Sequence, residues 1–307
     1  AKLLENGNVS SLIDQVPELE RLLFHGYVIA AVDVRGGGAS YGTREGEFSR
    51  AESLDAYDIT EWLAAQPWST GKIGMFGISY LGITQYMAAS TQPPHLVAIF
   101  PQMAMFDLYF FVHTGGVFKE DFLLSWGQKT FLLDRIIDPP PVDEDTSRAL
   151  LAKARAEHTD NWNIYELALA SPYRDAQIDG RDIYSELSPS TYLDAINASG
   201  VAMYHLGGWY DMYPEDTLLW FNNLSVPQKV VITPWEHEGV GGFNLVAEHH
   251  RWFDYWLKGI DNGIMDEPPI VYDVMTRPGV YDWRTTDAWP LPETQNTPFY
   301  FAAGPSS

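Results

Sequence analysis

The sequence predicts an α/β fold, in which the strands of a parallel sheet alternate with helices around a helical insertion. Three observations predict it. Short apolar runs bounded by glycine or charge, typical of strands buried on both faces, alternate with helical apolar spacing up to residue 118. Helical patterns then continue over residues 119–199, and the alternation resumes over 200–262. From residue 263 onward, a proline-rich segment with short β-type runs indicates the opening of an all-β region.

The elements of the first part follow in order. Residues 1–23 are predicted as a polar start followed by a helix. The proline in Gln66-Pro67-Trp68 ends a later helix. The alternating elements are strands at 26–33, 72–77 and 96–100, and helices at 51–65 and 81–89.

The second part predicts fewer elements. Strands are expected at 201–206 and 229–233, helices at 215–224 and 247–258, and β-type runs at 270–275 and 298–301. We therefore divide the chain into four segments: a first part of the α/β core (1–118), a helical cap (119–199), a second part of the core (200–262) and the start of a β region (263–307).

Composition excludes several classes of function. The chain has 307 residues, of which 46% are apolar and 14% aromatic, so it can bury a sizeable core. Its net charge of −22 argues against binding to nucleic acid or to an anionic membrane. The absence of cysteine excludes disulfides, thiolate metal sites and a cysteine nucleophile. The N-terminus has no signal-peptide core, which favours a cytoplasmic protein, with secretion left open if that end is processed or missing.

The segment most informative about chemistry is GMFGISYLG, where a predicted strand runs through a small-residue turn into a helix. Ser79 lies in that turn, which is typical of a nucleophile elbow that pushes the serine Oγ out of the sheet. The N–H of Tyr80, at the helix N-terminus, is placed to stabilise an oxyanion. The pattern is G-x-S-x-x-G, because Leu81 takes the place of the second glycine of G-x-S-x-G.

A serine hydroxyl needs a base, and the base needs an acid to orient it. The strand at 201–206 leads into Gly-Gly-Trp-Tyr-Asp211, and the strand at 229–233 leads into Pro-Trp-Glu-His237. Because the carboxyl ends of parallel strands meet at one edge of a sheet, Asp211 and His237 are expected near Ser79. Rivals are predicted to lie on helices instead: Glu215 and Asp216 for the acid, His249 and His250 for the base.

The sequence resembles the CocE/NonD serine hydrolases, a family related to the X-Pro dipeptidyl-peptidases. The resemblance rests on GYVIAAVDVRGGGASYGTREGEF, EWLAAQPWSTGKIGMFGISYLGITQYMAA, GGWYD, TPWEH and HHRWFDYWLKGIDNGIMDEPPI. It implies an α/β-hydrolase core with an inserted helical cap, followed by a C-terminal jelly-roll that only begins here. It also implies a Ser-His-Asp triad of Ser79, His237 and Asp211. Trp126 and Tyr213 correspond to aromatic residues that line the acyl pocket.

The resemblance leaves alternatives open. It implies further sheet strands before residue 26, with a tyrosine whose hydroxyl is the second oxyanion donor. Because neither these strands nor a complete jelly-roll is visible, we expect a chain truncated at both ends. The expected activity is cleavage of carboxylic esters or amides through an acyl-enzyme. The alternatives are a dipeptidyl-peptidase, and an impaired fragment or binding protein without catalysis.

No cofactor or metal is expected. The glycine-rich loop at 35–42 lacks the G-x-G-x-x-G spacing of a dinucleotide site, and the acidic run at 143–145 lacks that of a calcium loop. The histidines around His237 do not form H-E-x-x-H. The expected partner is a small ester or amide, and the sequence is compatible with a homo-oligomer.

Overall fold

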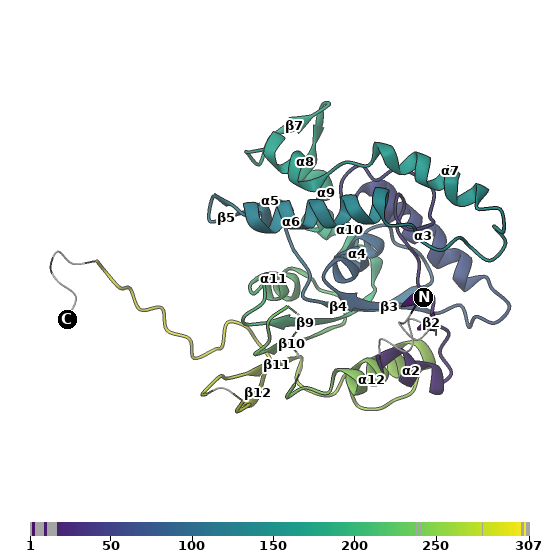
Figure 1. Ribbon diagram of the computed structural model, residues 1–307. Coiled ribbons are helices and arrows are strands. Elements are labelled where there is room, and N and C mark those ends of the chain that lie inside the picture. The colour runs from purple at the N-terminus through teal and green to yellow at the C-terminus, as the bar shows by residue number, and fades with distance from the viewer. Residues whose placement is uncertain are drawn as a thin grey trace.

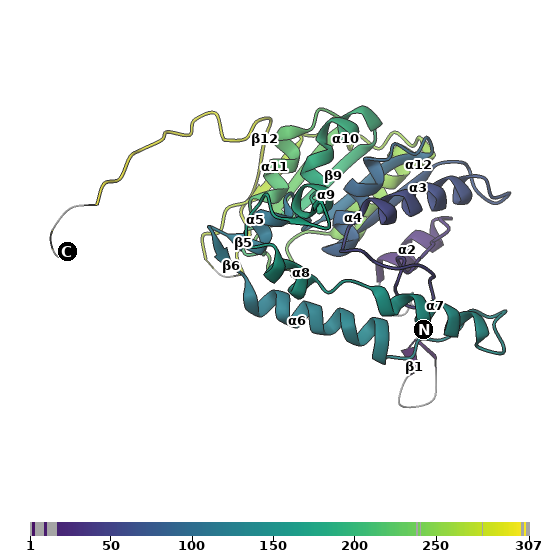
Figure 2. The ribbon, with the colours of Figure 1, turned by 90° about the horizontal axis from the view of Figure 1, so that it is seen from above.

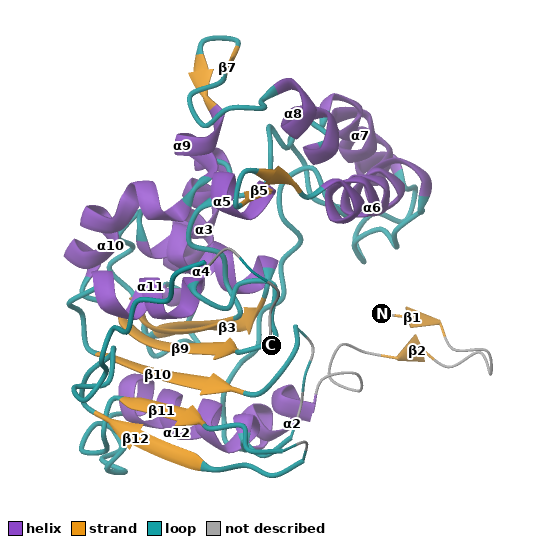
Figure 3. Cartoon of the chain, turned by 90° about the vertical axis from the view of Figure 1, so that its left-hand side faces the viewer, coloured by secondary structure: helices purple, strands orange, loops and turns teal. Residues whose placement is uncertain are grey.

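A computed structural model describes residues 2–3, 9–10, 17–237, 239, 241–277, 279–301 and 304. Its centre is a six-stranded sheet with the order β12-β11-β10-β9-β4-β3 (Figures 1 and 3). The five strands from β3 to β11 are parallel, and β12 is antiparallel to β11. The strands are β3 (Ile73–Ile78), β4 (Leu96–Gln102), β9 (Ala202–Gly208), β10 (Gln228–Thr233), β11 (Ile270–Asp273) and β12 (Trp283–Thr286).

Helices cover both faces of this sheet, as Figure 1 shows. On one face, α12 (Leu245–Lys258) packs on β3 and β4, with α2 (Pro17–Phe24) beside it. On the other face, α4 (Tyr80–Ala89) packs on the same two strands and α11 (Asp216–Asn223) on β9 and β10. The remaining helices of this layer, which pack against α4, are α3 (Arg50–Ala64) and α10 (Leu193–Ser199).

Capping side chains set several of these helix boundaries. The Ser49 hydroxyl accepts the N–H of Glu52 at the start of α3, and Asn244 does the same for Ala247 at the start of α12. Gly259 ends α12 in the left-handed conformation. The strands at 72–77, 96–100, 201–206 and 229–233 and the core helices are thus confirmed within a few residues.

The segment between β4 and β9 lies over the α4 face (Figures 1 and 2). It is mainly helical, as expected, and also holds two short hairpins. Besides α10, its elements are α5 (Leu108–Val112), β5 (His113–Thr114), β6 (Val117–Phe118), α6 (Glu120–Phe131), the π-helical turn η1 (Leu132–Ile136), α7 (Ala149–Glu157), η2 (His158–Asp160), α8 (Ile164–Ala170), β7 (Gln177–Ile178), β8 (Arg181–Asp182), α9 (Ile183–Leu187) and η3 (Pro189–Tyr192).

The strand predicted at 26–33 is absent. The chain there joins no ladder, and Val28 and Val32 are 62% and 55% exposed. Side-chain contacts hold its start instead: Tyr27 packs on Phe253 and donates a hydrogen bond to Asp254, both in α12. An apolar run indicates burial, but a strand also needs a neighbour to pair with. Among the described residues, no strand lies beyond β3 to provide one.

The prediction of a separate β region after residue 262 is wrong for the first of its β-type runs. The run at 270–275 forms β11, which pairs in parallel with β10 and so belongs to the central sheet (Figure 3). Its apolar residues are buried against β10, which explains why the run is apolar. The run at 298–301 forms no strand, and its aromatic side chains are exposed. No jelly-roll is seen in the described residues.

Two further observations complete the fold. A short hairpin pairs β1 (Lys2–Leu3) with β2 (Val9–Ser10), and most of the helix-preceding residues of the predicted polar start lie outside the described residues. In the part of the chain that the structure describes, every helix is too short or too polar to cross a bilayer.

Candidate active site

Ser79 occupies a sharp turn between β3 and α4. Its backbone has φ 61° and ψ −123°, a conformation that non-glycine residues rarely adopt, and such strain persists only where the surrounding structure enforces it. The Ser79 N–H donates to the Gln102 carbonyl at the end of β4, 3.0 Å away. A Cβ on Gly82 would lie 2.7 Å from that same carbonyl oxygen, so glycine allows α4 to approach β4. This is the elbow that the sequence predicts.

The leucine that interrupts G-x-S-x-G has a simple explanation. The close approach to β4 occurs at Gly82, whereas the Leu81 side chain lies beside Gly77 and is 59% exposed. A bulky residue at position 81 therefore leaves the turn intact. The neighbouring N–H of Tyr80 is the first of α4 and donates no hydrogen bond among the described residues.

The predicted acid and base lie together at the same edge of the sheet. Asp211 follows β9 and His237 follows β10, and Asp211 Oδ1 lies 2.6 Å from His237 Nδ1. The two loops are in close contact, because the Tyr210 N–H donates to the Trp235 carbonyl. A Cβ on Gly208 would lie 2.3 Å from that carbonyl oxygen, so only glycine fits there.

The environments of Asp211 and His237 differ. The Asp211 carboxylate is fully buried, and its second oxygen accepts the Tyr213 N–H at 3.1 Å. The His237 side chain is 23% exposed, and the Tyr213 ring lies edge-on to it with centroids 5.9 Å apart. Asp211 is thus held on both oxygens and in turn fixes the His237 ring, whose Nε2 has no hydrogen-bond partner among the described residues.

The rival residues have other partners. Asp216 accepts the Phe106 N–H at 2.7 Å, and burial raises its pKa to about 7. His249 lies buried in α12, where burial lowers its pKa to about 3 and keeps the ring neutral. His250 faces Asp254 one helical turn along α12. None of them contacts Ser79 or Asp211 among the described hydrogen bonds.

Ser79 opens into a small cavity beneath α6 that also meets the other predicted pocket residues. It offers about 30 Å³ to the centre of a water molecule, room for one or two waters. The cavity is lined by Ser79 together with Tyr80, Trp126 and Tyr213. His237 is not part of this lining, and among the described residues no hydrogen bond joins His237 to Ser79. The remaining lining residues are Glu47, Phe48, Ile83, Met105, Leu108, Phe111, Phe122, Leu123 and Ile164.

Two buried glutamates of this region were missed at the level of sequence. Glu47 Oε1 accepts the Trp126 indole N–H at 2.6 Å, and Glu52 Oε2 accepts the Tyr80 hydroxyl at 2.8 Å. Burial raises the pKa of each carboxyl to about 7. The only signal for Glu47 was the charged loop Arg44-Glu-Gly-Glu47 before a capping serine, which is typical of a solvated turn. Glu52 lies three residues after Ser49, the spacing of a capping box, which predicts a role in the helix start. Phe48, at φ 63°, is the strained residue that signals a constrained loop there.

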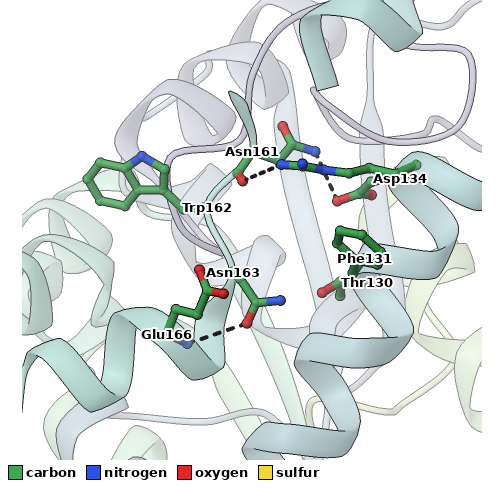
Figure 4. A pocket seen from close by; sticks show the side chains of 8 residues that line it. Thr130, Phe131, Asp134, Asn161, Trp162, Asn163 and Glu166 are labelled. Carbon is green, nitrogen blue, oxygen red and sulfur yellow. Dashed lines mark hydrogen bonds between the residues drawn. The ribbon is translucent and has the colours of Figure 1, made fainter. Parts of the chain in front are cut away.

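A buried ion pair between Arg44 and Asp134 lies near Glu47. The Arg44 guanidinium contacts the Asp134 carboxylate of η1, and both side chains are buried. Asp134 also accepts from the Asn161 amide at 2.9 Å, across a polar crevice of about 110 Å³ shown in Figure 4. We call Arg44, Glu47, Glu52 and Asp134 the carboxyl cluster.

The fold and the sheet edge define a class of protein: an α/β protein with a strained serine after one strand and an Asp–His pair after two others, as in serine hydrolases. The family described as X-Pro dipeptidyl-peptidase (S15 family) matches residues 5–239. The chain belongs to this family, and the resemblance drawn from the motifs is confirmed.

Two relatives agree with this assignment, and one solved structure shares the fold. A putative serine esterase from Mycobacterium bovis is 31% identical, covering 92% of this chain and 52% of the relative. Cocaine esterase from Rhodococcus sp. is 29% identical, covering 90% and 52%. A CocE/NonD family hydrolase from Staphylococcus aureus has a similar fold, with a TM-score of 0.72 at 24% identity, covering 88% and 44%. The chain spans about half the length of these relatives.

Proposed function

We propose that this chain carries the catalytic centre of a serine hydrolase that cleaves carboxylic esters or amides through an acyl-enzyme. The observation that carries the proposal is the strained Ser79 at the same sheet edge as the bonded Asp211–His237 pair. Family membership and relatives named as esterases support it. In this proposal, residues 119–199 act as the cap, because Phe122, Leu123 and Trp126 of α6 cover the cavity at Ser79.

The proposed roles follow from the geometry. Ser79 Oγ attacks the carbonyl carbon while His237 Nε2 takes the hydroxyl proton. Asp211 accepts the Nδ1–H of His237 and so keeps Nε2 free to act as the base. The Tyr80 N–H donates to the oxyanion at the N-terminus of α4. His237 then protonates the departing alcohol or amine.

Water completes the cycle. His237 takes a proton from a water molecule, which attacks the acyl carbon and releases the acid and the Ser79 hydroxyl. Esters are the expected substrates, since an amine leaving group needs more complete protonation by the general acid, His237, than an alcohol does. Trp126 and Tyr213 are proposed to contact the acyl group, because both line the cavity at Ser79.

A dipeptidyl-peptidase is the second candidate, because the matching family is described by that activity. The two activities are separated by comparing p-nitrophenyl esters with Gly-Pro p-nitroanilide. Faster turnover of the esters, by at least a hundredfold in kcat/KM, is the expected result. The opposite order would make the protein a peptidase.

The proposal itself is tested with a fluorophosphonate probe followed by peptide mass mapping. We expect a label on Ser79 in the wild type and no label in Ser79→Ala. The kcat for ester turnover should fall by roughly 10⁶-fold in this variant. A folded chain that takes no label would show that the site is not catalytic and would favour a binding protein. Thermal unfolding of the wild type and of Ser79→Ala controls for folding.

A further inference from the structure

The wall of the cavity formed by α6 is held in place by a polar contact. Trp126 projects from α6 and donates its indole N–H to Glu47 Oε1 at 2.6 Å, which joins this helix to the loop before α3. The Phe122 ring lies parallel to the Trp126 ring, and Lys129 Nζ lies 4.9 Å from the ring centroid. The indole therefore has contacts on three sides while it lines the cavity at Ser79.

This cavity is too small for most acyl groups. About 30 Å³ of space for water centres admits one or two waters, so a longer acyl chain that enters this cavity displaces a side chain of the wall. The opposite side of the cavity is formed by Phe48, Ile83, Met105 and Leu108, which are buried and belong to the main apolar core. Phe122 and Trp126 of α6 are only partly buried, so they are the wall side chains that move at least cost, and because their rings stack, the position of Trp126 also limits that of Phe122.

We propose that Glu47 is a positioning residue that sets the acyl-chain length by holding Trp126 across the cavity. The proposal rests on the proposed esterase function. The bond is strong when Glu47 is ionised, because a charged acceptor roughly doubles the strength of a hydrogen bond. Breaking it frees the ring and opens the cavity for longer acyl groups.

The state of Glu47 depends on its surroundings. Burial raises its pKa to about 7, against the opposing effects of the Arg44 charge and the Trp126 hydrogen bond. Below pH 7 the carboxyl is protonated and the bond to the indole weakens, so longer acyl groups are accepted more readily. The charged and titratable groups that face Glu47 or its partner Trp126 are Arg44, Glu52, Tyr80, Lys129, Asp134 and Tyr213.

The test compares p-nitrophenyl hexanoate with p-nitrophenyl acetate. The ratio of their kcat/KM values cancels the titration of the proposed triad, which both esters share. We expect this ratio to be lowest in the wild type at pH 8 and a few-fold higher at pH 6. Glu47→Gln keeps a neutral acceptor, so its ratio should match the wild type at pH 6 and stay flat with pH. Glu47→Leu removes the acceptor and should raise the ratio about tenfold over the wild type at pH 8.

Matched variants distinguish this role from a general effect of buried charge. Glu52→Gln removes the neighbouring buried carboxyl and should leave the pH dependence of the ratio in place. Trp126→Phe removes the N–H and should abolish that dependence. The proposal is overturned if the wild-type ratio is flat between pH 6 and 8, if Glu47→Gln keeps the slope, or if Glu52→Gln removes it.

A second readout needs no turnover. The Trp126 indole N–H signal, assigned in ¹⁵N-labelled protein by its loss in Trp126→Phe, should shift with a midpoint near pH 7 and stay fixed in Glu47→Gln. An inactive, unlabelled wild type would overturn the proposed function, whereas an indole signal that does not titrate would overturn the role of Glu47. The two failures are therefore separate.

Discussion

The sheet edge and the carboxyl cluster behind it hold charged groups in different ways. At the edge, Asp211 and His237 follow the ends of neighbouring strands, and their contact is fixed by backbone bonds between two short loops. In the cluster, Arg44, Glu47 and Asp134 come from a loop and a π-helical turn that lie far apart in the sequence. The edge is built by the sheet, whereas the cluster exists only when the helical segment packs on the core.

This difference teaches where each region is sensitive. Changes at the edge should affect chemistry with little effect on folding, since the strands hold the loops in place. Changes in the cluster should affect stability and its pH dependence, because its charges are buried and depend on one another. The predictions below test that separation.

Among the changes that test this separation, the largest effect is expected from Asp211→Asn. The amide can present an N–H to His237 Nδ1 in place of the acceptor, which favours the tautomer that cannot take the Ser79 proton. We expect kcat for ester hydrolysis to fall on the order of 10⁴-fold with an unchanged midpoint of thermal unfolding. A loss of less than tenfold would remove Asp211 from the proposed triad, and Asp216→Asn is the matched control at the rival acid.

Arg44→Met should affect stability instead. It leaves Asp134 and Glu47 buried without their cation, and breaking a buried pair costs about 3–5 kcal/mol. Chemical denaturation measures the loss. The double variant Arg44→Met with Asp134→Leu should recover part of the lost stability, because it also removes the Asp134 carboxylate that the single variant leaves without its cation. Equal stability of wild type and single variant would show that the pair is not buried in solution.

How far the sequence predicts the molecule follows the same division. The placement of Ser79, Asp211 and His237 was predictable because each follows a predicted strand, and the carboxyl ends of parallel strands meet at one edge of the sheet. The apolar run at 26–33 misled, because such a run predicts a strand that neighbours pair with and bury, whereas no described strand pairs with it and Val28 and Val32 are exposed. Glu47 was not predictable, because its burial depends on Trp126 from a segment 79 positions away. Local patterns contain no information on that packing.

The pH dependence of stability tests the cluster at Glu52. Burial raises the pKa of this carboxyl from 4.5 to about 7 in the folded state, so folding takes up a proton between these values. Its contribution to stability is therefore present below about pH 4.5 and is lost as pH rises to 7. The free energy of unfolding of Glu52→Gln, measured relative to the wild type, should therefore be higher at pH 8 than at pH 5 by about 2–3 kcal/mol. Glu144→Gln, at an exposed loop position, removes the same charge and should show no such gain.

The smallest effect is expected at the elbow itself. Leu81→Gly restores the G-x-S-x-G pattern, but the close contact with β4 lies at Gly82 and the Leu81 side chain is exposed. Glycine within the first turn of α4 costs about 0.5–1 kcal/mol of stability through backbone entropy, and Leu81→Ala should cost less. Turnover of p-nitrophenyl acetate should change by less than twofold in both variants. A large gain in kcat for Leu81→Gly would show that the leucine constrains the serine turn, and the edge would then depend on side-chain packing as the cluster does.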